Sequence, residues 1–141
     1  MKTLKTFLLF TVVVASVYYV KINLGHWIGP KLDLSTDLYD FGSIEEGKTA
    51  QYYIKFKNNG RLPLKLTGVF SDCGCTVVDW SDEKIPSGQM DSILVEYDTK
   101  KVGLINRIVT INSNSADSPH AFYIIGNVRQ SILINEIEGA M

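Results

Sequence analysis

The sequence predicts an all-β domain: a two-layer antiparallel β-sandwich of seven strands, preceded by one N-terminal hydrophobic helix. From Leu32 onward, apolar and polar residues alternate with the period of two that is typical of half-buried strands. Turn residues separate these alternating runs at intervals of roughly 8–12 residues, and no helical period lies between them. Each such strand has one apolar face, and two sheets packed face to face bury all of these faces together.

The N-terminal segment, residues 1–24, has the composition of an export signal. Lys2 and Lys5 precede an uncharged run from Phe7 to Val20, and Lys21 ends that run. A positive start followed by about 14 apolar residues fits a cleaved signal peptide. A retained signal-anchor helix needs about 20 residues, which the run approaches when its apolar flanks are included.

The choice between these two readings depends on the cleavage site. The small residues around Ala15 lie inside the apolar run, where they make a poor cleavage site. Tyr18, Tyr19 and Trp27 resemble the aromatic residues that flank membrane helices. We therefore expect a membrane anchor through residues 4–24 with the rest facing the periplasm or exterior; secretion after signal cleavage is the alternative.

The elements follow in order along the chain. Residues 25–31, with Gly29 and Pro30, read as a linker, because these two residues break a helix. The sandwich is expected at 32–134 and a C-terminal tail at 135–141. The expected strands are a first one at 31–44, broken in its middle and with a bulge at Gly42, then 49–57, 64–70, 76–80, 93–97, 104–111 and a last strand from 122 that runs on through Ile134.

Charge and composition exclude several classes of function. Lys plus Arg number 14 and Asp plus Glu 15, so the chain lacks the basic excess of a nucleic-acid-binding protein. The two histidines, His26 and His120, offer no Ser-His-Asp set. His120 is expected in a solvated loop at the end of the sandwich opposite the cysteines. We therefore expect no catalytic residues and no cofactor.

Cys73-Gly74-Cys75 holds both cysteines of the chain and allows three readings. The first is a local disulfide, since bridged cysteines have Cα atoms about 4.4–6.8 Å apart and Gly74 permits the bend that brings them together. The second is a pair of thiolates holding Cu(I). The third is a pair of buried thiols that only pack in the core. No other metal site is expected, because zinc would want four ligands.

Several short motifs together resemble a known bacterial family. These are Phe41-Gly42-Ser43-Ile44, Asn58-Asn59-Gly60, Cys73-Gly74-Cys75-Thr76, Pro86-Ser87-Gly88 and Gly126-Asn127-Val128. They are similar to the domain of unknown function 1573, over roughly residues 32–128. The resemblance implies an immunoglobulin-like sandwich in an exported or membrane-attached protein, and it implies no established activity.

These observations predict a non-enzymatic, membrane-tethered extracytoplasmic domain for protein interaction or scaffolding, with a protein partner in the cell envelope. The alternative is a thiol-dependent copper-binding or redox module that uses Cys73 and Cys75. Domains of this kind bind through an edge strand or through the loops at one end. We expect the end that carries the cysteines, with Glu45, Glu46, Lys48, Asp72, Gly74, Lys100 and Lys101, to be the interaction end.

Overall fold

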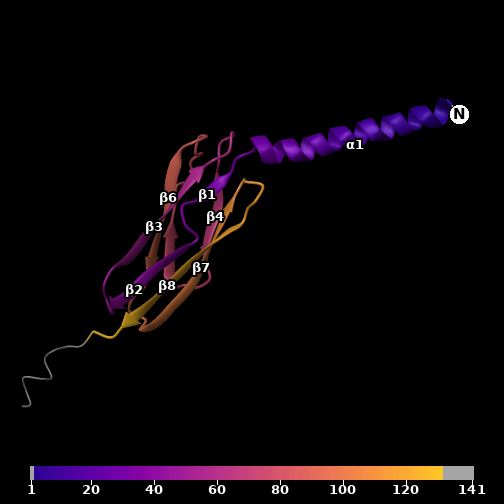
Figure 1. Ribbon diagram of the computed structural model, residues 1–141. Helices are drawn as coiled ribbons and strands as arrows, with labels where there is room; N and C mark the ends of the chain where they lie inside the picture. The colour runs from indigo at the N-terminus through magenta and orange to yellow at the C-terminus, as the bar shows by residue number, and fades with distance from the viewer. Residues whose placement is uncertain (1, 132–141) are drawn as a thin grey trace, which may run out of the picture.

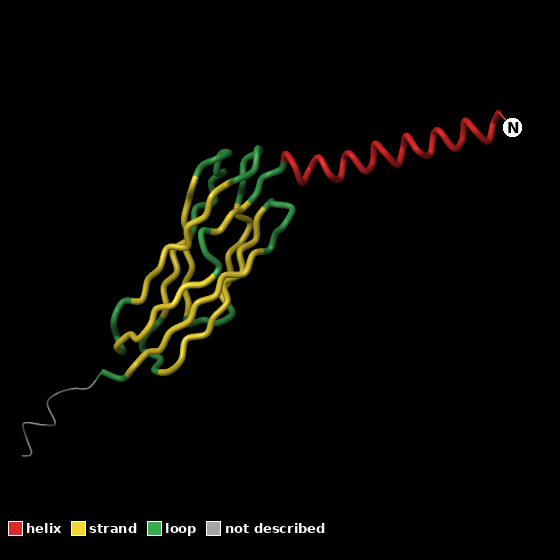
Figure 2. The backbone as a smooth tube through the Cα atoms, in the orientation of Figure 1, coloured by secondary structure: helices red, strands yellow, loops and turns green. Residues whose placement is uncertain are grey.

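The computed structural model describes residues 2–131, apart from the side chains of residues 2–5 and 22–27. A single helix, α1 (Lys2–Ile28), leaves one end of a domain built from strands (Figures 1 and 2). The described side chains of α1 are all exposed. Among the described residues, no helix has both the length and the apolar content needed to span a membrane.

The strands form two sheets of four. In the first sheet the order is β1 (Leu32–Leu34), β3 (Ala50–Asn58), β6 (Met90–Tyr97) and β5 (Thr76–Asp79). In the second sheet it is β2 (Leu38–Glu45), β8 (His120–Arg129), β7 (Gly103–Ser113) and β4 (Leu66–Ser71). The chain is thus mostly β in two layers with one N-terminal helix, as the sequence predicts.

The expected count of seven strands is wrong, because the broken first strand is two strands in different sheets. β1 pairs antiparallel with β3, and after residues 35–37 the chain crosses to the other sheet, where β2 pairs with β8. The β2–β8 pair is parallel, so the prediction of a wholly antiparallel sandwich is also wrong at this edge. The bulge expected at Gly42 is confirmed: the register shifts between Asp40 and Ser43, and Gly42 has a φ of 64°.

The apolar faces of both sheets share one core. Ile54 and Phe56 of β3 are fully buried, as are Phe122 and Ile124 of β8 in the opposite sheet. The Tyr52 ring of the first sheet lies between two rings of the second, with centroids 3.6 Å from Tyr39 and 5.9 Å from Phe122. The period of two therefore predicts the buried face of the central strands correctly.

The domain has two unlike ends. We call residues 45–50, 71–76 and 97–103 the thiol end, and residues 58–64, 80–89 and 114–119 the helix end. α1 joins the domain at the helix end, while β8 finishes at the thiol end (Figure 1).

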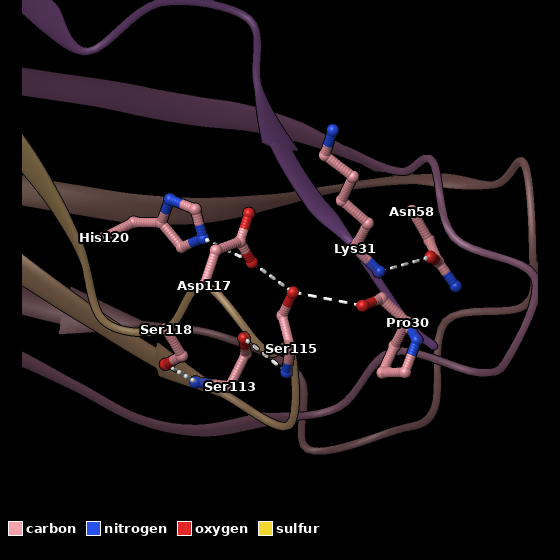
Figure 3. Close-up of polar contacts among 8 residues, drawn as sticks. All are labelled: Pro30, Lys31, Asn58, Ser113, Ser115, Asp117, Ser118 and His120. Carbon is pink, nitrogen blue, oxygen red and sulfur yellow. Dashed lines mark hydrogen bonds and ion pairs between the residues drawn. The ribbon is translucent and has the colours of Figure 1, made fainter. Parts of the chain in front are cut away.

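The connection between α1 and the domain is short and firmly held. The helix runs to Ile28, so only Gly29–Lys31 of the segment expected as a linker at 25–31 is not helical. The carbonyl oxygens of Gly29 and Lys31 accept hydrogen bonds from the N–H groups of Arg61 (3.1 Å) and Asn59 (2.9 Å). The Ser115 hydroxyl lies 3.1 Å from the Pro30 carbonyl oxygen (Figure 3). Backbone hydrogen bonds thus fix this segment to the domain.

Candidate functional site

The structure brings all seven residues of the predicted interaction end to the thiol end. Glu45 is the last residue of β2, Glu46 and Lys48 follow it in the connection to β3, and Asp72 and Gly74 lie between β4 and β5. Lys100 and Lys101 lie between β6 and β7. Glu46 is half-buried and the other six are exposed, so their charged groups are available to a partner.

Hydrogen bonds tie the three loops of the thiol end together. The hydroxyl of buried Thr99 donates to the Lys48 carbonyl oxygen at 2.6 Å, which joins the third loop to the first. The Asp98 N–H donates to the Cys75 carbonyl oxygen at 2.9 Å, which joins the third loop to the second. The thiol end is therefore one connected surface rather than three independent loops.

A pocket of about 420 Å³ opens between these loops. Gly74, Cys75 and residues 47–50 are among the residues that line it. Its lining carries charges of both signs, from Lys48 and Lys100 and from Glu96 and Asp98. Such a surface can receive a polar peptide segment, but it has no excess of one charge that would select an anion or a cation.

Cys73 and Cys75 are joined by a disulfide, with an S–S distance of 2.01 Å and a Cα–Cα distance of 5.3 Å. This bridge lies where the chain crosses from β4, at the edge of one sheet, to β5, at the edge of the other. Cys75 is buried and lines the pocket, Cys73 is half-buried and Gly74 is exposed. Within the described residues no group of three or more His, Cys, Asp or Glu side chains could hold a metal ion. Copper binding by the two thiolates stays a prediction that requires the reduced form.

Several polar groups surround the Cys73 sulfur. The Cys75 N–H donates to Cys73 Sγ at 3.3 Å, and the Thr76 hydroxyl lies 3.6 Å from the same sulfur. The Cys73 N–H donates to Ser71 Oγ at 3.4 Å. The first two contacts place hydrogen-bond donors at Cys73 Sγ, whereas Cys75 Sγ has no such contact within the described residues.

Arg107 is a residue of this region that the sequence reasoning missed. Ser71 of β4 pairs with Val109 of β7, and the Asp72 N–H donates to the Ile108 carbonyl oxygen at 3.2 Å. The printed pairing of β4 with β7 ends here, and Arg107 is the second residue before Val109 on β7. Arg107 is half-buried, and its Nε is a buried donor with no hydrogen-bond partner among the described residues. Arg107 has the same period-two spacing as the inward-facing residues Ile105 and Val109. That spacing is the sequence pattern that could have identified it.

The helix end holds a Ser-Asp-His cluster that the sequence also did not predict (Figure 3). Asp117 contacts the Ser115 hydroxyl on one side, and its Oδ1 lies 3.5 Å from His120 Nε2 on the other. The carboxylate thus lies between the serine and the histidine, whereas a hydrolase relay needs the histidine in the middle. The cluster is therefore a structural contact, and its Ser115 hydroxyl also reaches the carbonyl oxygen of Pro30.

His120 does not occupy the solvated loop that was expected. It is the first residue of β8 and is half-buried, because its pairing with Ile111 draws it into the sheet. Burial alone would raise the pKa of Asp117, but hydrogen bonds from the Ser115 hydroxyl and its own backbone N–H, with the neighbouring His120, hold that pKa below its ordinary value. His120 lies at the helix end, away from the cysteines, which agrees with the prediction that it does not join a thiol site.

Comparison with known proteins establishes the family. The family model described as a protein of unknown function, DUF1573, matches residues 32–128. The chain belongs to the DUF1573 family. The resemblance predicted from the short motifs is therefore confirmed. No curated protein matches this DUF1573 chain.

Solved structures similar to this DUF1573 chain support its fold. A protein of unknown function from Porphyromonas gingivalis W83 superposes with a TM-score of 0.64 at 17% identity, covering 72% of this chain and 48% of that protein. The chain thus spans about half the length of that protein. PapD-like domain 7 of human CEP192 gives a TM-score of 0.61 at 10% identity, covering 72% of this chain and 87% of that one. The secreted serine protease VesC of Vibrio cholerae gives 0.55 at 16% identity, covering 75% and 25%. At these identities the likeness shows the fold alone.

Proposed function

We propose that this DUF1573 chain is an exported, membrane-tethered, immunoglobulin-like sandwich that binds a protein of the cell envelope through its thiol end and catalyses no reaction. The likeness to a PapD-like domain supports the immunoglobulin-like assignment. Function does not follow from such a fold, so the proposal depends on how the two ends of the domain differ.

The single observation that carries the proposal is the opposite placement of the helix and the pocket. The helix end is occupied by Gly29–Lys31, which loops 58–61 and 113–118 hold by hydrogen bonds. The thiol end carries a pocket of about 420 Å³ with a mixed-charge lining. A domain held at one end presents the other end to its surroundings, and β7, with 11 residues at about 3.4 Å each, separates the ends by about 37 Å.

The tether is supported by the surface of α1. The apolar side chains that the structure describes on this helix are all exposed; Phe7 is 72% exposed and Phe10 is 68% exposed. Uncovered apolar surface of this extent is costly in water, and a lipid environment would remove that cost. At about 1.5 Å per residue, the 27 residues of the helix extend about 40 Å. Signal cleavage would remove the same surface and is the alternative.

Site-specific photo-crosslinking in intact cells tests this proposal. A photoreactive residue replaces Lys48 or Lys101 at the thiol end, and Arg61 or Lys84 at the helix end, all of which are exposed. We expect a discrete protein adduct from the two thiol-end positions and none from the two helix-end positions. Adducts that form equally at both ends, or at the helix end alone, would contradict binding through the thiol end.

A further inference from the structure

We propose that the Cys73–Cys75 disulfide is a site of thiol–disulfide exchange with a protein dithiol, and that Cys73 is the sulfur through which exchange passes. This inference does not depend on the proposed binding function, because it concerns the reactivity of the bond itself. It rests on three observations: the size of the ring that the bond closes, the unequal exposure of the two sulfurs, and the polar groups around Cys73.

The bond closes a very small loop. Its cysteines are separated by two positions in the sequence, so the bond removes little conformational entropy from the unfolded chain. The core that the two sheets form consists mostly of aliphatic and aromatic side chains, with Cys75 as one of its buried members. A disulfide that contributes little to the stability of the native state is among those that thiols reduce most readily.

The two sulfurs differ in access. Cys75 is only 4% exposed, whereas Cys73 is half-buried and lies beside exposed Gly74. An incoming thiolate attacks the disulfide sulfur that it reaches more easily, and the greater exposure of residue Cys73 favours its Sγ over that of Cys75. The new bond joins the partner sulfur to Cys73, the Cys73–Cys75 bond breaks, and its electron pair remains on Cys75 Sγ, which takes a proton from water.

The second step of the exchange releases Cys73 and completes the transfer of two electrons. The other thiolate of the partner dithiol attacks the partner sulfur of the mixed disulfide, and Cys73 leaves as the thiolate. The partner is oxidised to a disulfide, and Cys73 and Cys75 are reduced by the same two electrons. In the reverse direction Cys75 resolves the mixed disulfide on Cys73, so both directions pass through Cys73.

The surroundings of Cys73 stabilise the thiolate that this scheme requires. The Cys75 N–H at 3.3 Å is a fixed donor to Cys73 Sγ, and the Thr76 hydroxyl at 3.6 Å is a second one. Donors and cations near a cysteine favour its thiolate form. Asp72 is exposed and opposes this effect less strongly than a buried acid would.

The experiment compares the two single-cysteine chains. Full-length Cys75→Ser retains Cys73, and full-length Cys73→Ser retains Cys75. Each variant is treated with oxidised glutathione at neutral pH, and the formation of the glutathione adduct is followed by mass spectrometry. We expect the Cys73 thiol to react about tenfold or more faster than the Cys75 thiol. In the Cys75→Ser chain, Thr76→Val removes the hydroxyl that lies 3.6 Å from Cys73 Sγ and should move the pH midpoint of the reaction upward, and Thr76→Ser should restore it.

A second experiment uses the unmutated chain, so its result does not depend on how the variants fold. It is treated with reduced glutathione, quenched with acid and mapped by peptide mass. The expected result is a glutathione adduct on Cys73. An adduct on Cys75, a bond that stays intact, or equal rates for the two single-cysteine chains would overturn the proposal. An unchanged pH midpoint in Thr76→Val would contradict the claim that the polar surroundings of Cys73 stabilise its thiolate.

Discussion

Replacing Asn58 by alanine lowers the free energy of unfolding by about 4 kcal/mol, because four hydrogen bonds of one fully buried side chain are lost at once. Asn58 is fully buried. Its Nδ2 donates to the carbonyl oxygens of Leu62 and Ile85, both at 2.9 Å. Its Oδ1 accepts from the N–H of Gly60 at 2.9 Å and of Lys31 at 3.3 Å. Each buried group left unpaired costs about 1–3 kcal/mol, reduced where water can enter.

Urea unfolding followed by circular dichroism measures this effect. Asn59→Ala is the matched control, since Asn59 is the adjacent residue of the same type and is exposed; its expected cost is within about 1 kcal/mol. Asn58→Asp should destabilise as well, because a carboxylate cannot donate to the Leu62 and Ile85 carbonyl oxygens. A loss for Asn58→Ala no larger than that for Asn59→Ala would show that the side chain does not hold the helix end together.

Replacing Phe122 by alanine removes about 3–5 kcal/mol of stability, the range observed for large aromatic side chains deleted from a core. Phe122 is fully buried on β8, and its ring stacks with that of Tyr52 at 5.9 Å across the two sheets. The truncation therefore leaves a cavity at the contact between the sheets. The same urea titration measures the change.

Phe70→Ala is the control for the Phe122 experiment, because it removes the same atoms from an outward position. Phe70 lies on edge strand β4 and is 57% exposed, so its loss should cost about 1 kcal/mol or less. If the two substitutions cost the same, the two sheets do not share the core described above.

The sequence predicted the local features of the fold and missed those that depend on distant partners. Alternation identified the buried face of β3, because Ile54 and Phe56 have the same period wherever the strand lies in the sheet. The division of the first strand into β1 and β2 could not be predicted, since an alternating run has the same pattern in either sheet. The parallel pairing of β2 with β8 joins residues about 85 positions apart, which no local pattern encodes.

The grouping of three loops at the thiol end was also predictable from the sequence. Connections between successive strands tend to alternate ends, and this rule placed the loops of Lys48, Gly74 and Lys100 together. The state of the cysteines was not predictable, because a disulfide, a thiolate pair and buried thiols share one sequence. Arg107 was missed because a charged residue in an inward series is usually assigned to the outside. The Ser115–Asp117–His120 cluster lies partly in a loop, whose geometry periodicity does not determine.

The central claim is that the thiol end binds an envelope protein, and the yield of photo-crosslinked adduct tests it most directly when charges at each end are reversed. With the photoreactive residue at Lys48, the adduct is quantified in the unchanged chain, in Lys100→Glu/Lys101→Glu and in Arg61→Glu/Lys84→Glu; all four substituted residues are exposed. We expect the thiol-end pair to reduce the yield about tenfold and the helix-end pair to leave it within about twofold. An unchanged yield in Lys100→Glu/Lys101→Glu, or an equal loss in both, would contradict the account.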